Sequence, residues 1–248
     1  MIVKVMVIKR LHLKLSPVVI TVLFVLLVDL ASGSPQKSDT TRNPYHLNLV
    51  SDILDYRKQA NADPRLELVN LENVIPGIVT DIRYATANNF TGEVIYEMAR
   101  AYARHPVAVA LKLVQDSLAV HGLGLKIYDA YRPYAATLRF FEVYPDTNFV
   151  ANPRFGSRHN RGCAVDITLV DLTTKQEIAM PTVFDDFTEK AHPQYTNLPQ
   201  EVIANRTFLF SVMKYFGFTF YHSEWWHFDF DGWEKYPLMD LTFDQLEH

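Results

Sequence analysis

The feature that most constrains this chain is residues 157–166, Ser-Arg-His-Asn-Arg-Gly-Cys-Ala-Val-Asp. They place the imidazole of His159 and the carboxylate of Asp166 on either side of an expected turn at Gly162. The segment is complete only with residues 224–227, Glu-Trp-Trp-His, which add a second imidazole and a second carboxylate. Two histidines and one aspartate can form a three-ligand zinc site of the catalytic kind, which keeps one coordination position open. The spare Glu224 is then the group that transfers protons.

Spacing alone leaves this interpretation open, because the chain has nine histidines and chance pairs are common. Ser157 and Gly162 frame His159, Asp166 falls on an expected strand, and His227 follows an aromatic pair. On the residues alone, a metal site and ordinary surface or core histidines both remain possible interpretations.

The first 33 residues have the pattern of a secretory signal peptide. Basic residues precede an apolar run over residues 18–28, and the small residues 31–34 follow it. The run is shorter than the about 20 apolar residues that a membrane span needs, and an uncleaved signal anchor is the alternative. We therefore expect a periplasmic or secreted protein with no stable membrane insertion after the signal is removed.

Beyond the signal we expect an N-terminal extension over residues 34–65 and one folded domain over residues 66–248. A hydrophobic content of 48% and an aromatic content of 13% are typical of a globular protein. The net charge of −4 provides no argument for nucleic acid as a partner. Cys163 is the one cysteine, so no intramolecular disulfide forms, and a small, buried, inert thiol is expected there. The sequence carries no signal for an oligomeric state.

The hydrophobic periodicity predicts a mixture of helices and strands. Helices are expected over residues 47–57, 105–121, 134–143 and 199–215. Strands are expected over residues 66–73, 78–84, 125–131, 164–172, 218–221 and 226–230, the first two as a strand–turn–strand unit and the fourth half-buried. A long irregular loop is expected over residues 181–198, and loops of that length are usually functional or disordered. This order favours the α+β class, with a mainly antiparallel sheet and helices packed against it in a single catalytic domain.

The motifs resemble those of the zinc D-alanyl-D-alanine dipeptidases, the VanX-type metallopeptidases, which are grouped with the zinc D,D-carboxypeptidases. Ser-x-His-x-Arg-Gly-x-Ala-x-Asp and Glu-Trp-Trp-His carry the resemblance, together with residues 81–92, 128–133 and 184–187. It spans about residues 66–232. It implies an enzyme with one Zn²⁺ per chain that hydrolyses the small dipeptide D-Ala-D-Ala in cell-wall peptide turnover.

The resemblance also implies roles for individual residues. His159, Asp166 and His227 would be the zinc ligands, and Glu224 the general base. Arg132 would stabilise the oxyanion of the tetrahedral intermediate. A structural ion pair between Arg132 and Asp129 is the alternative for that arginine.

A dipeptidase must also hold the free amino terminus of its substrate. The resemblance assigns this role to Asp185, Tyr84 and Ser157. The adjacent Asp186 leaves the register of Asp185 open.

Two departures from the family concern Cys163, where serine or alanine is usual, and the secretion signal, which the cytoplasmic dipeptidases of the family lack. The signal favours salvage or turnover of D-Ala-D-Ala over antibiotic resistance. Two other functions compete with the dipeptidase: a zinc D,D- or L,D-carboxypeptidase acting on peptidoglycan stem peptides, and a non-catalytic cell-wall recognition domain. An open groove in place of the Asp185 pocket would favour the carboxypeptidase. The presence of Glu224 and Arg132 argues against the recognition domain, because binding alone requires neither.

Overall fold

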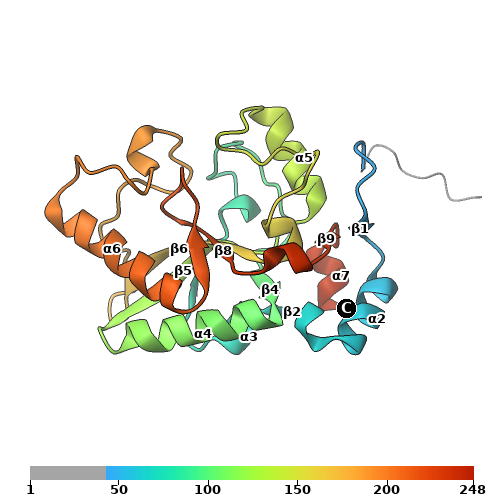
Figure 1. Cartoon of the computed structure of the whole chain (residues 1–248), viewed down its shortest axis with the longest axis horizontal. Helices are drawn as coiled ribbons and strands as arrows, with labels where there is room; N and C mark the ends of the chain where they lie inside the picture. The colour runs from blue at the N-terminus through green and yellow to red at the C-terminus, as the bar shows by residue number, and fades with distance from the viewer. Residues whose placement is uncertain (1–42) are drawn as a thin grey trace, which may run out of the picture. The chain divides into compact units, whose positions relative to one another are not determined.

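The computed structural model describes residues 43–248 (Figure 1). The expected signal peptide over residues 1–33, and residues 34–42 of the expected extension, lie outside the described residues. The described chain begins with strand β1 (Leu49–Val50) and helix α2 (Ile53–Ala62). β1 pairs in parallel with β9 (Leu238–Met239), so this segment packs against the end of the chain. Among residues 43–248, no helix combines the length and apolar character needed to cross a membrane.

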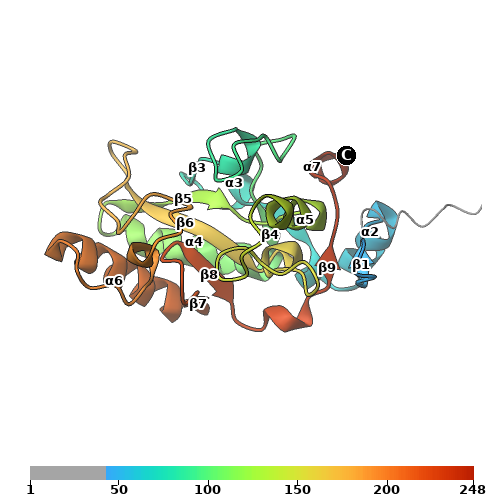
Figure 2. The same ribbon diagram turned by 90° about the horizontal axis from the view of Figure 1, so that it is seen from above.

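A five-stranded mixed sheet forms the centre of the fold, in the order β3-β5-β6-β8-β7. Figure 2 shows these strands side by side: β3 (Val79–Thr80), β5 (Leu123–Asp129), β6 (Ala164–Asp171), β8 (His227–Phe230) and β7 (Phe218–Phe220). The pairs β5–β6, β6–β8 and β7–β8 are antiparallel, and β3–β5 is parallel. The predicted, mainly antiparallel sheet is confirmed, with one parallel pair at its edge.

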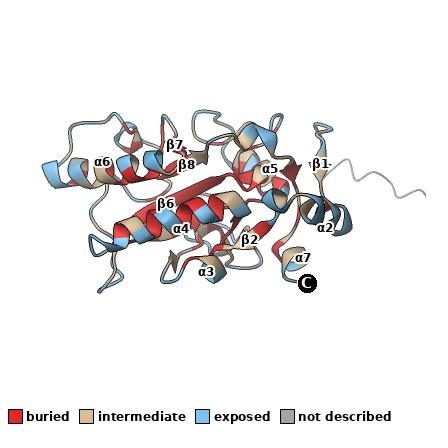
Figure 3. Cartoon of the chain, turned by 60° about the horizontal axis from the view of Figure 1, so that its bottom comes forward, coloured by how far each residue is buried: buried red, intermediate tan, exposed pale blue. Residues whose placement is uncertain are grey.

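Helices cover both faces of this sheet. α4 (His105–Ala119) and α6 (Gln200–Tyr215) lie along one face, and α5 (Tyr134–Val143) lies over the other (Figures 1 and 3). α4 has Pro106 in its first turn and buries apolar residues at helical spacing: Val107, Leu111, Val114 and Leu118. The short helices α3 (Leu71–Val74) and α7 (Phe243–Glu247) complete the helical part. The α+β class is confirmed.

Strand β6 is buried on both of its faces. Every residue from Ala164 to Val170 is buried, and Figure 3 shows the strand in red beside α4 and α6. The prediction of a half-buried strand is wrong. Its alternating polar positions, Asp166 and Thr168, suggested a polar side that faces the site, but both residues are buried in the structure.

Three local predictions differ from the structure, two of them because polar side chains cap helices there. The helix expected over residues 47–57 begins at Ile53, where Asp52 accepts hydrogen bonds from two backbone amides of the first turn. The strand expected over residues 66–73 covers only β2 (Leu68–Asn70), since Asn70 caps α3. The strand expected over residues 78–84 covers only β3. β2 pairs with β4 (Tyr102–Arg104), so β2 and β3 do not form a hairpin.

The turn between the 3-10 helix η3 (His159–Arg161) and β6 requires Gly162. Its φ of +69° lies in the left-handed region that favours glycine. A Cβ at this position would lie 2.6 Å from Cδ2 of Leu68 and 3.4 Å from the backbone nitrogen of Arg104. That nitrogen donates a hydrogen bond to the Gly162 carbonyl at 2.9 Å. The turn is therefore pressed against β2 and β4, and this packing determines where His159 lies.

We expect Gly162→Ala to lower the free energy of unfolding by about 2–5 kcal/mol. The left-handed backbone contributes about 1–2 kcal/mol of this loss, and overpacking against Leu68 contributes about 1–3 kcal/mol. Gly92→Ala is the matched control, because Gly92 has the same φ of +69° and a Cβ added there would have no atom within 4 Å. Urea denaturation of the three proteins measures the difference. Equal losses in the two variants would show that packing around Gly162 contributes nothing.

Candidate metal centre and active site

The register of the central strands brings two of the predicted metal ligands together. Asp166 on β6 lies directly opposite His227 on β8, and Asp129 on β5 lies opposite Asp166 on its other side. Residues directly opposite one another on antiparallel strands project from the same face of the sheet. Oδ1 of Asp166 accordingly lies 3.0 Å from Nδ1 of His227.

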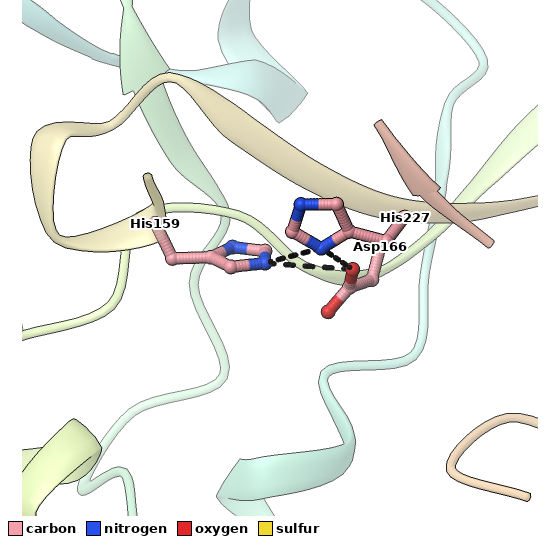
Figure 4. Close-up of side chains that lie close together, drawn as sticks. All are labelled: His159, Asp166 and His227. Carbon is pink, nitrogen blue, oxygen red and sulfur yellow. Dashed lines mark hydrogen bonds and ion pairs between the residues drawn. The ribbon is translucent and has the colours of Figure 1, made fainter. Parts of the chain in front are cut away.

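His159 reaches the same point from the η3 turn. Its Nε2 atom lies 3.1 Å from Nδ1 of His227 and 3.4 Å from Oδ1 of Asp166 (Figure 4). Ligands about 2.0–2.1 Å from a tetrahedral zinc ion are about 3.3 Å apart, which agrees with the spacing of these three atoms. Two imidazole nitrogens and one carboxylate oxygen are also a donor set that suits zinc. The three predicted ligands therefore meet in a geometry that can hold one metal ion.

Hydrogen bonds orient both imidazoles toward this point. Nδ1 of His159 donates to the Ala130 carbonyl at 2.7 Å, which leaves Nε2 free for a metal. Nε2 of His227 lies 3.0 Å from Oδ1 of Asp229, which leaves Nδ1 free. The sequence analysis missed Asp229. The spacing His-x-Asp on a strand could have revealed it, because residues two apart on a strand share a face.

The carboxylates around His227 also favour its protonated form. Burial opposes a charged imidazole, but Asp229 and Asp166 outweigh it and raise the pKa of His227 to about 10. A metal ion must therefore displace a proton from this imidazole, so metal affinity falls as the pH is lowered.

Glu224 lies beside the metal-facing nitrogen of His227, with its Oε2 atom 3.8 Å from Nδ1. The residue is buried just before β8, and the adjacent Trp225 donates its backbone N–H to the Ala191 carbonyl at 3.0 Å. Burial raises the pKa of the Glu224 carboxyl to about 7. A carboxyl with this pKa can both accept and release a proton near neutral pH.

Arg132 forms the ion pair with Asp129 that was its alternative role. Its Nε and Nη2 atoms both donate to Oδ2 of Asp129, at 3.0 and 2.8 Å. Nη2 also lies 3.7 Å from Oδ2 of Asp166, and the residue lines the same cavity as the ligands. Asn160, which the sequence analysis missed, donates from Nδ2 to the Arg132 carbonyl at 2.9 Å. The ion pair and this backbone contact hold the guanidinium beside the metal centre.

Tyr84 and Asp185 form a pair on one wall of the cavity. The Tyr84 hydroxyl donates to Oδ1 of Asp185 at 3.1 Å. Asp185 has a left-handed backbone with φ of +61°, and its Oδ2 atom is buried without a hydrogen-bond partner among the described residues. Burial raises the pKa of the Asp185 carboxyl well above its usual range. The adjacent Asp186 instead accepts from the Thr188 N–H at 3.0 Å, so Asp185 is the one of the two that lines the cavity.

Ser157 is bonded within its own loop. Its Oγ accepts from the Asn160 N–H at 3.1 Å, and its N–H donates to Oδ1 of Asn160 at 2.7 Å. It nevertheless lines the same cavity, which has a volume of about 640 Å³ and contains all eight predicted site residues in its wall: Tyr84, Arg132, Ser157, His159, Asp166, Asp185, Glu224 and His227. Cys163 is buried outside this wall, and burial raises the pKa of its thiol to about 12, as expected for an inert cysteine.

We expect Asp229→Asn to weaken metal binding by about 10- to 100-fold, with one ion still bound at saturation, because the carboxylate orients His227. Asp231→Asn is the matched control, since Asp231 lies just beyond the same strand and contacts Thr219 at 3.2 Å. Competition with a chromophoric chelator measures both affinities. Equal affinities for the two variants would contradict the orienting role of Asp229.

Comparison with known proteins shows the family of this chain. The model of a family described as D-ala-D-ala dipeptidase matches residues 64–244. The D-alanyl-D-alanine dipeptidase of Escherichia coli is 36% identical over 173 residues, which cover 70% of this chain and 89% of that protein.

Two further relatives carry the same name. The protein of Enterococcus faecium is 30% identical over 187 residues, covering 67% of this chain and 92% of the relative. The protein of Streptomyces coelicolor is 32% identical over 194 residues, covering 70% and 95%. The chain belongs to the D-Ala-D-Ala dipeptidase family and is a metallopeptidase.

Proposed function

We propose that this chain is a zinc-dependent dipeptidase that hydrolyses free D-Ala-D-Ala. The observation that carries the proposal is one cavity that holds a three-ligand metal centre, a buried carboxyl with a pKa near 7, and a separate carboxylate with an unpaired oxygen. The three relatives named D-alanyl-D-alanine dipeptidase support the choice of substrate.

The reaction divides among a few groups. When bound, zinc supplies a Lewis acid that polarises the scissile carbonyl and makes a nearby water more acidic. Glu224 takes a proton from the attacking water and delivers it to the leaving amine nitrogen. Arg132, held in place by Asp129, donates hydrogen bonds to the negative charge that develops on the carbonyl oxygen.

The pair of Tyr84 and Asp185 favours a dipeptide over a longer peptide. A free dipeptide has an ammonium group next to its single peptide bond, whereas a stem peptide has another amide there. Oδ2 of Asp185 is buried and has no hydrogen-bond partner among the described residues, so an ammonium group can donate to it. An ammonium group there also favours the ionised carboxylate, which burial alone disfavours.

We propose that the enzyme acts outside the cytoplasm on dipeptides released during cell-wall turnover. The support for this location is the composition of residues 1–33, which have the pattern of a secretory signal peptide.

Hydrolysis of D-Ala-D-Ala and of N-acetyl-D-Ala-D-Ala by the zinc-loaded protein tests the substrate class. We expect cleavage of the free dipeptide alone, and loss of that cleavage after chelation. Asp185→Asn should lower kcat/KM for the free dipeptide by about 100-fold, because the ammonium group loses its charged partner. Asp186→Asn is the matched control. Preferential cleavage of the acetylated peptide would indicate a carboxypeptidase instead.

The pKa of Glu224 sets a testable pH dependence. A general base must be ionised, so kcat/KM should fall about tenfold per pH unit below the pKa of Glu224. Burial raises this pKa to about 7, and a bound cation shifts it back downward. Glu224→Gln should lower kcat by about 10²- to 10⁴-fold, with unchanged metal content. Its residual activity should lack this limb of the profile, because glutamine does not titrate. A Gln variant with wild-type turnover would rule out the assigned role.

A further inference from the structure

Four arginines line the active-site cavity, and they differ in what their guanidinium groups contact. Arg132 is bonded to Asp129, and Arg161 donates to the Tyr236 carbonyl. Arg154 is exposed at the rim, where water can satisfy its donors, and it lies over the ring of Tyr45. Arg158 differs from the other three, because its Nε atom is buried and has no hydrogen-bond partner among the described residues.

The guanidinium of Arg158 is held in the cavity by aromatic rings. Its Cζ atom lies 4.9 Å from the ring centroid of Trp233 and 5.5 Å from that of Tyr221, and both rings also line the cavity. Contacts with aromatic faces position a guanidinium while leaving its in-plane N–H donors available. A buried donor without a partner is unfavourable, so this arrangement favours an acceptor supplied by a ligand.

The nearest carboxylate does not fill this need. Oδ2 of Asp229 lies 3.6 Å from Nε of Arg158, which is longer than a hydrogen bond. The other oxygen of Asp229 is bound to His227 at 3.0 Å. Asp229 therefore attracts the guanidinium electrostatically but leaves its Nε donor without a hydrogen bond among the described residues.

We propose that Arg158 binds the C-terminal carboxylate of the substrate and thereby selects peptides whose leaving residue has a free acid. This inference rests on the proposed dipeptidase function. A guanidinium suits a carboxylate because two parallel N–H groups can donate to its two oxygens. Arg132 is held by Asp129 and is assigned to the carbonyl oxygen of the scissile bond, so Arg158 is the cavity cation best placed to complement the terminal acid.

The two charged ends of a dipeptide then meet different walls of the cavity. Asp185 is bonded to Tyr84, whose ring packs with Phe140 and Phe184. Arg158 packs with Tyr221 and Trp233. The first group provides a negative charge for the ammonium end, and the second provides a positive charge for the acid end. A dipeptide is the shortest peptide that can present both charges on either side of one scissile bond.

A purely structural role for Arg158 makes a different prediction. If Arg158 only positions Asp229, and through it His227, then loss of Arg158 weakens the metal centre and lowers kcat/KM equally for every substrate. If Arg158 binds the carboxylate, its loss affects only substrates that have one. D-Ala-D-alaninamide distinguishes the two roles, because it replaces the acid with a neutral amide and keeps the scissile bond.

The experiment measures kcat, KM and metal content of the full, zinc-loaded chain with D-Ala-D-Ala and with D-Ala-D-alaninamide. We expect Arg158→Gln to lower kcat/KM for D-Ala-D-Ala by about 30- to 100-fold, mainly by raising KM. The same variant should change kcat/KM for D-Ala-D-alaninamide by less than about threefold. Arg158→Lys should recover part of the loss, because it restores the charge without the paired donors. Arg154→Gln is the matched control in the same cavity, and it should change kcat/KM for neither substrate by more than about twofold.

Two results would overturn the proposed role of Arg158 and leave the dipeptidase function intact. They are an equal loss of kcat/KM for both substrates, or no loss of kcat/KM for D-Ala-D-Ala. Wild-type protein that cleaves neither substrate while retaining zinc would instead overturn the proposed function, and this inference with it.

Discussion

The antiparallel pairing of β6 with β8 is the interaction on which the rest of the site depends. It sets Asp166 opposite His227, and the separate pairing of β5 with β6 sets Asp129 opposite Asp166. A shift of one residue would turn each side chain to the other face of the sheet and separate the ligands. β6 is the middle strand and is buried on both faces, so its register is strongly specified by packing. Packing of the protein core around β6 therefore fixes the relative positions of the candidate metal ligands Asp166 and His227.

Buried charge around this centre is compensated within the protein, except where a substrate is expected. Asp129 is neutralised by Arg132, and Asp229 by His227. Among the described residues, Oδ2 of Asp185 and Nε of Arg158 are buried in the cavity wall without a hydrogen-bond partner. Unpaired buried polar groups cost stability, so natural proteins retain them mainly where function requires them. One acceptor and one donor, on different walls, match the ammonium and carboxylate of a small peptide.

The sequence predicted what depends on neighbouring residues. Periodicity located α4, α5, α6 and most of the central strands, and the motif around His159 named candidate ligands that the structure brings together. The sequence did not predict contacts between segments that are distant along the chain. The pairing of β1 with β9 and of β2 with β4, and the cover over the polar side of β6, all depend on the tertiary fold. Asp229 and Asn160 were missed for the same reason, because each matters only through the residue that it holds.

Anomalous diffraction at the zinc absorption edge, from crystals of the zinc-loaded protein, tests the central claim most directly. The account predicts one peak per chain, within bonding distance of Nε2 of His159, Oδ1 of Asp166 and Nδ1 of His227. Nε2 of His227 should remain bonded to Asp229 in that structure. A peak outside this triad, or zinc bound through Nε2 of His227, would contradict it.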